Sequence, residues 1–153
     1  MQLDDAATIL SRADFFEVCD ADQRRLLAFA SERKKYRPGT LIYKAGDVPE
    51  GAHVLVSGTI ATTHAGAEDN PFLVHTEGAV ISAVALIVAR PRPVTVKAVD
   101  AVETLFVPRT AFMKLAQQYP DLAARAADYI RRDLSGYLGA IETMKPKMRG
   151  GNP

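Results

Sequence analysis

Two arginines set among prolines are the residues of this chain best suited to bind a ligand. They stand in Arg90-Pro91-Arg92-Pro93, after an expected short helix at 83–89 and before an alternating, strand-like run at 94–98. Proline restricts the backbone, so both guanidinium groups would be held with their charges aimed at one place. A guanidinium donates two parallel hydrogen bonds to phosphate oxygens, and the pattern therefore predicts a phosphate site.

The wider stretch from Gly78 to Ala98 carries a longer motif. Its matching positions are Gly78, Ala85, Leu86, Arg92, Thr95, Val96 and Ala98. On these residues the stretch resembles the phosphate-binding cassette of cyclic-nucleotide-binding domains, usually Gly-x-x-x-Gly-Glu-x-Ala-Leu-Leu-x-x-x-x-Arg-x-Ala-Thr-Val-x-Ala. Three positions depart from that pattern: Ser82 stands for the second glycine, Ala83 for the glutamate, and Pro93 for a frequent serine or alanine.

The resemblance implies a role for each cassette position. Arg92 would pair with the cyclic phosphate, and the backbone N–H groups of Ala83, Val84 and Ala85 would cradle it at the start of the short helix. Ala83 cannot accept from a ribose 2′-hydroxyl, a loss of about 1–3 kcal/mol or one to two decades in affinity. Ser82 matters if the backbone needs a positive φ there, because a β-carbon disfavours it. At position 93, proline supplies no N–H.

Arg92 also has a structural alternative, which the sequence leaves open. It could be an ordinary turn arginine paired with a carboxylate such as Glu77 or Asp47. Arg90 is expected to be a solvated neighbour without a role of its own.

Other polar side chains show no catalytic or metal-binding pattern. The histidines are not spaced as metal ligands, and the serines have no evident histidine and carboxylate partners; these residues are His53, His64, His75, Ser11, Ser31, Ser57 and Ser135. We therefore expect no metal, no cofactor and no enzyme activity. Cys19 is expected to be a small buried hydrophobic residue.

Composition fits one soluble domain. The chain has 153 residues, of which 48% are hydrophobic and 24% charged, and its net charge is +1. This balance requires neither nucleic acid nor an anionic membrane as partner, and no apolar run reaches the length of a membrane span. A single cysteine and the lack of a signal pattern suggest a cytoplasmic protein. We expect one domain over 1–145 and a disordered tail over 146–153.

The elements that must position the cassette follow from periodicity. Helical patterns cover 8–16 and 20–33, with Asp20 or Asp22 as an N-cap and Phe15-Phe16 as a core anchor. Short alternating runs separated by glycine turns follow at 40–44, 54–56, 59–63, 72–75 and 99–107. Helices return at 109–119 and 121–144, with Pro120 in the first turn of the second. The fold class is α+β: an antiparallel, jelly-roll-like β-roll flanked by N-terminal helices and a long C-terminal helix.

The long helix carries a second signal. Its apolar residues step by four, three, four and three, as in a coiled-coil seam: Ile130, Leu134, Tyr137, Ile141 and Met144. Leu122, Ala123, Ala126 and Tyr129 can cover the roll from another face, so the seam predicts a homodimer. The alternative is that the seam folds onto its own roll.

The order of elements resembles the sensor half of catabolite-activator-type transcription regulators. In that family the long helix dimerises the protein and covers the base, which would place Tyr137 and Ser135 near a bound nucleotide. The resemblance implies a stand-alone sensor of a cyclic nucleotide, cAMP or cGMP, or of a related small phosphate ligand. It would signal through the long helix to an unknown protein partner, without direct DNA binding because no recognition helix or basic stripe follows. An interaction module that has lost nucleotide binding is the alternative, and a haem- or gas-sensing relative a third.

Overall fold

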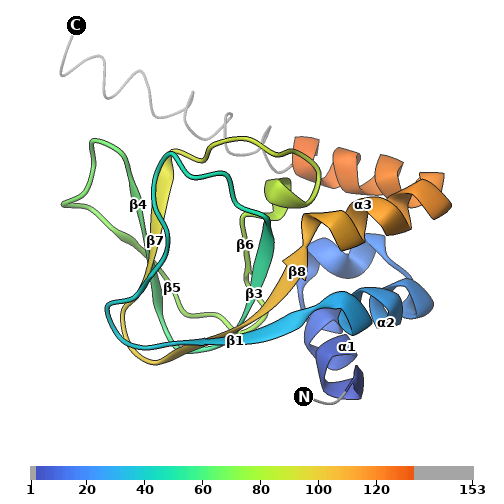
Figure 1. The fold of residues 1–153 in the computed structure, drawn as a ribbon, viewed down its shortest axis with the longest axis horizontal. Coiled ribbons are helices and arrows are strands. Elements are labelled where there is room, and N and C mark those ends of the chain that lie inside the picture. The colour runs from blue at the N-terminus through green and yellow to red at the C-terminus, as the bar shows by residue number, and fades with distance from the viewer. Residues whose placement is uncertain (1–2, 133–153) are drawn as a thin grey trace, which may run out of the picture.

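The computed structural model describes residues 3–132, and they form one β-roll with helices gathered at one end (Figure 1). Several expectations lie outside the described residues. These are the long helix beyond 132, the tail at 146–153, and all of the seam except Ile130.

The N-terminal helices pack together at that end. They are α1 (Leu3–Ser11), a 3-10 turn η1 (Asp14–Val18) and α2 (Ala21–Ala30). The expected helix at 8–16 is wrong in both bounds, because the backbone of Ala13 is extended and separates α1 from η1. Phe15 and Phe16 then enter the core as predicted, with ring centroids 5.1 Å apart.

Asp20 starts α2 with a reciprocal cap, as the sequence indicated. Its side chain accepts from the Gln23 N–H at 2.8 Å, and the Gln23 side chain accepts from the Asp20 N–H at 2.9 Å. Such a capping box satisfies two N–H groups that the helix leaves free. The helix ends earlier than expected, at Ala30, and the chain continues as strand from Glu32.

Eight short strands build the roll. They are β1 (Glu32–Tyr36), β2 (Leu41–Tyr43), β3 (Gly51–Ser57), β4 (Ile60–His64), β5 (Phe72–Val74), β6 (Val80–Ile81), β7 (Val94–Ala98) and β8 (Val102–Pro108). They form two antiparallel four-stranded sheets in the orders β1-β8-β3-β6 and β2-β7-β4-β5. The fold class predicted from the sequence is confirmed.

Strands β3 and β8 have both faces covered. One face of this pair contributes Ala52, Val54, Leu105 and Val107 to a core shared with the helices. The opposite face contributes Leu55 to a second core inside the roll. The backbones of the two strands lie so close that a β-carbon on Gly51 would meet the Val107 carbonyl oxygen at 2.1 Å. The helix layer and the roll interior therefore share one rigid wall.

The C-terminal part returns to helix. Helix α3 (Arg109–Gln118) is followed by a second helix that begins at Pro120 and continues to the end of the described residues at 132. Leu122 and Ala126 are fully buried, as expected, whereas Ala123 is exposed and does not cover the roll. Ile130, expected to open the dimer seam, is partly buried against this chain's own core. No helix in residues 3–132 is both long and apolar enough to cross a membrane.

Candidate functional site

The cassette begins at a glycine that cannot be replaced freely. Gly78 has a φ of +90°, and a β-carbon there would lie 2.9 Å from the carbonyl oxygen of Arg12. Strand β6 follows, and Ser82 then takes φ 64° and ψ 47°, the left-handed conformation. In residues 3–132 it is the one non-glycine residue with positive φ. The substitution of serine for the family's glycine was expected to matter if the backbone had a positive φ at this position. The φ of Ser82 is positive, so the substitution places a β-carbon where the backbone disfavours one.

A 3-10 turn, η2 (Ala83–Leu86), follows Ser82 directly. The expected helix at 83–89 is therefore shorter than predicted, and the chain leaves it before Arg90. The first N–H groups of a helical turn have no partner within the turn. Those of Ala83 and Val84 are of this kind, while Ala85 donates to the Ser82 carbonyl at 2.9 Å.

Tyr43 reaches the cassette from strand β2. Its hydroxyl forms a hydrogen bond with the Ser82 hydroxyl, across 39 residues of sequence. Burial raises the pKa of Tyr43, while the bond to Ser82 and the charge of Arg92 oppose that rise. A non-glycine residue in the left-handed region costs about 1–2 kcal/mol, and the hydroxyl pair holds Ser82 there.

Arg92 is fixed by its backbone, and its guanidinium, which hydrogen-bonds Tyr43, keeps one nitrogen without a partner in residues 3–132. Its N–H donates to the Asp47 carbonyl at 3.0 Å, and its carbonyl accepts from the Gly46 N–H at 2.8 Å. Its Nε is buried and has no hydrogen-bond partner among the described residues. A buried charged donor without a partner is costly, so such a group calls for an anion to complete it.

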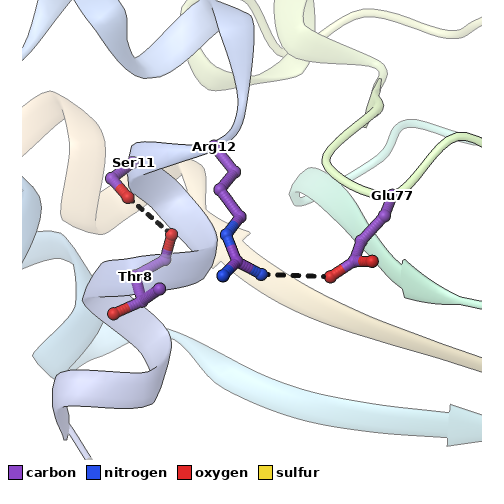
Figure 2. A network of polar contacts seen from close by, with 4 residues as sticks. All are labelled: Thr8, Ser11, Arg12 and Glu77. Atoms are coloured by element: carbon purple, nitrogen blue, oxygen red, sulfur yellow. Dashed lines mark hydrogen bonds and ion pairs between the residues drawn. The ribbon is translucent and has the colours of Figure 1, made fainter.

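The carboxylates expected to make Arg92 a structural arginine are engaged elsewhere. Glu77 pairs with Arg12 at 3.3 Å, and Figure 2 shows the two side chains pointing toward one another. The Asp47 carboxylate accepts from the Lys44 N–H at 3.0 Å. Arg90, in contrast, is exposed, as expected of a solvated neighbour.

Two further residues support the cassette. The Thr95 hydroxyl accepts from the Ala45 N–H at 2.9 Å and so fixes the loop that holds Arg92. Arg109, the first residue of α3, donates to the Pro49 carbonyl at 2.7 Å and to the Ala85 carbonyl at 3.1 Å. One guanidinium therefore ties η2 to the helix layer. Tyr43 and Arg109 could not be recognised from the sequence as parts of the site, because neither stands next to the cassette in the chain.

A cavity of about 420 Å³ lies beside Tyr43 and Pro49; its lining does not include Arg92 or η2. Its lining includes Tyr43, Tyr36, His53, Phe106 and Lys34. His53 is buried, its Nδ1 lies 3.0 Å from the Thr104 hydroxyl, and burial lowers its pKa to about 4. The histidine is therefore neutral at pH 7. Its surroundings are polar and aromatic, which suits a small planar or hydroxylated group.

The remaining candidates take no part in this arrangement. His64 and His75 are exposed, and residues 3–132 contain no cluster of three metal-ligating side chains. Ser11 and Ser31 donate to carbonyl oxygens within or at the end of their own helices (Figure 2 shows Ser11 and Thr8). Cys19 is buried, as expected, and burial raises its pKa to about 11.

The structure thus brings one group of predicted residues together. Ser82, Ala83, Val84 and Ala85 form the turn, and Arg92 projects beside Tyr43. Pro93 is exposed and its carbonyl accepts from the Ala65 N–H at 3.0 Å, so it serves the neighbouring hairpin. Tyr137, the expected base-covering residue, lies outside the described residues.

Known proteins share this architecture. A family model described as the cyclic nucleotide-binding domain matches residues 33–119. A cAMP-dependent protein kinase regulatory subunit from Pyricularia oryzae is 29% identical over 106 residues, 69% of this chain. Among solved structures, cAMP-bound PfPKA-R superposes with a TM-score of 0.73 at 20% identity over 94% of the chain. The catabolite activator protein of Thermus thermophilus superposes with a TM-score of 0.71 at 20% identity over 87%.

These relatives are longer. The chain spans 27% of the Pyricularia subunit, 47% of the PfPKA-R chain and 63% of the Thermus protein. The family model, over residues 33–119, covers the cassette and nearly all of the roll.

Proposed function

Because this chain belongs to the cyclic nucleotide-binding domain family, we propose that it is a non-catalytic regulatory module that binds a cyclic nucleotide or a related small phosphate ligand. The proposed site consists of η2, Arg92 and Tyr43, beside the cavity that Tyr43 lines.

The proposal rests on Arg92, because one nitrogen of its guanidinium is buried and unpaired within residues 3–132. Its Nε is buried without a partner among the described residues, while its backbone is held on both sides by the Gly46–Asp47 loop. A structural arginine spends its donors on carboxylates or carbonyls of its own chain. A ligand-binding arginine keeps them for an anion, and a phosphate accepts from Nε and a terminal nitrogen at once.

The hydroxyl pair beside Arg92 sets the expected affinity. Tyr43 and Ser82 use one of their two hydroxyl hydrogens in the bond between them, which leaves a single O–H to donate outward. Ala83 offers no acceptor for a ribose hydroxyl, and the pair is a weaker acceptor than a carboxylate. We therefore expect cyclic nucleotides to bind in the micromolar range or more weakly.

A calorimetric titration tests this function. The protein is titrated with cAMP, cGMP and, separately, inorganic phosphate, and its melting temperature is followed in parallel. Binding of either nucleotide up to millimolar concentration supports a nucleotide sensor, and binding of phosphate alone supports the broader class of ligand. No heat and no thermal shift with any of the three would refute the proposal.

We further propose that the module is a homodimer in the cytoplasm and that its signal leaves through the C-terminal helix. Its target is a protein partner and not DNA. The support is the apolar seam in the sequence, formed by Leu134, Tyr137, Ile141 and Met144; Ile130, at its start, is partly buried against this chain's own core. Sedimentation of the parent chain at tens of micromolar should give a dimer. The double variant Leu134→Glu with Ile141→Glu should give a monomer with an intact roll, and a monomeric parent would refute this part.

One observation favours the alternative of an interaction module. The cassette keeps Ser82 in a conformation that glycine adopts more easily, and stabilises it with Tyr43. This bond holds the turn in place without a ligand. If cAMP, cGMP and phosphate all fail to bind and the chain still sediments as a dimer, the interaction module is supported.

A further inference from the structure

Helix α2 exposes large apolar side chains at helical spacing. Phe29 is 79% exposed and Leu26 is 52% exposed, three residues apart on the same face. Leu27, between them, is only 1% exposed and faces the core. The helix is already anchored by its inner face, so its outer apolar residues contribute nothing to this chain's own core.

These side chains flank a groove between α2 and α3. It encloses about 320 Å³ and is lined by Leu26, Leu27, Phe29, Ala30, Ala111, Lys114, Leu115 and Gln118. Leu27 and Leu115 are buried at its base, while Phe29 and Leu26 stand at its edge. An apolar hollow lined by two helices can receive apolar side chains from one face of a third helix.

The charge of the groove is of one sign. Lys114 is the one charged residue in its lining, and helix α3 contains no acidic residue. The single acidic residue of α2 is Asp22, in the first turn. Among the described residues no carboxylate lies within ion-pair distance of Lys114. Its ammonium group is therefore available to an outside carboxylate.

We propose that this groove docks an amphipathic α-helix of a partner protein, with apolar side chains spaced i, i+3 or i+4, and i+7, and a carboxylate placed against Lys114. The complementarity of charge decides between this occupant and a second copy of the groove. Two copies facing each other would bring their Lys114 ammonium groups together without a carboxylate in either lining. The proposal is independent of the phosphate site, because no residue of the cassette lines the groove.

The test is a selection with the full chain as bait. A displayed library presents helical peptides of about 15 residues, the length at which an isolated helix becomes stable. Apolar residues occupy i, i+3, i+4 and i+7, and one flanking position varies among glutamate, glutamine and lysine. Selected peptides are then labelled and titrated by fluorescence anisotropy.

Matched variants make the result specific. Phe29→Ala should weaken selected peptides at least tenfold, about 1.4 kcal/mol, whereas Phe72→Ala should not. Phe72 is 70% exposed on strand β5, so both variants should keep the parent melting temperature.

Lys114→Glu should change the preferred flanking residue from glutamate to lysine, and Lys97→Glu, on the exposed face of β7, should not. Three results would overturn the proposal. They are a selection that enriches no peptide, peptides that bind the Phe29→Ala variant as tightly as the parent, and a charge preference that Lys114→Glu does not change. No enrichment is also the result expected if residues 133–153 or a second copy fill the groove.

Discussion

Replacing Arg92 by alanine separates the two roles that a partly buried arginine can have. Without ligand, the variant loses no carboxylate partner, because none of the described carboxylates pairs with Arg92. The variant also removes a buried donor that has no partner in the described part of the chain. Because burying that donor costs about 1–3 kcal/mol, its removal should raise the free energy of unfolding. The variant also loses the packing of two methylene groups, which lowers the free energy of unfolding by about 0.8 kcal/mol for each group that is fully buried. The free energy of unfolding should therefore change by about 1 kcal/mol or less, or should rise.

Ligand binding should respond very differently. Two charge-assisted hydrogen bonds from the guanidinium are worth about 1.5–3 kcal/mol each, so their loss should weaken binding by about a hundredfold or more. The assay is thermal unfolding with and without cAMP, together with calorimetric titration. Arg90→Ala is the matched control, since Arg90 is exposed two residues earlier in the same loop.

The expected pattern is a melting temperature within about 4 °C of the parent for both variants, and loss of binding for Arg92→Ala alone. A large fall in melting temperature for Arg92→Ala without ligand would refute the reasoning, because Arg92 would then stabilise the fold itself. Equal loss of binding in Arg90→Ala would refute the assignment of the site to Arg92.

Three other predictions test neighbouring features. Ala83→Glu should tighten cAMP binding ten- to a hundredfold in calorimetry, because it supplies about 1–3 kcal/mol of ribose acceptor; unchanged affinity would contradict the geometry of η2. His53 has a pKa of about 4 when folded, below its usual 6.5, so the unfolded state takes up the proton first as pH falls. Denaturant unfolding should show full stability above about pH 6.5 and a loss of up to about 3 kcal/mol toward pH 4, which His53→Gln should remove. Cys19, with a pKa raised to about 11, should react with a thiol reagent only when the protein unfolds; rapid reaction of the native protein would contradict its burial.

Much of the fold could be predicted because its signals are local. The change from helical to alternating periodicity after α2, the cap at Asp20 and the start of a helix at Pro120 each depend on neighbouring residues. Bounds were less accurate. Helix α1 ends at Ser11 because the chain must turn to bring Phe15 and Phe16 into the core, which is a tertiary demand.

The site could be predicted only along the cassette itself. Arg92 and Ser82 stand in a continuous motif, so the sequence identified them. Tyr43 reaches Ser82 across 39 residues, and Arg109 reaches Ala85 across 24 and Pro49 across 60. Strand periodicity gives the alternation of side chains but not which strands become neighbours, so these contacts required the three-dimensional structure.

The pairing of β1 with β8 has a consequence for how the chain folds. Strand β1 ends the first sheet, with β8 as its neighbour, and the ion pair of Arg33 with Glu103 joins residues 70 positions apart. The chain must lose the entropy of closing a loop of that length before the strand pair can stabilise it. For this reason sheets whose paired strands are distant in sequence fold slowly. During synthesis, β1 therefore has no strand partner until β8 has left the ribosome. The lysines and arginine of β1 keep that unpaired edge from joining another chain.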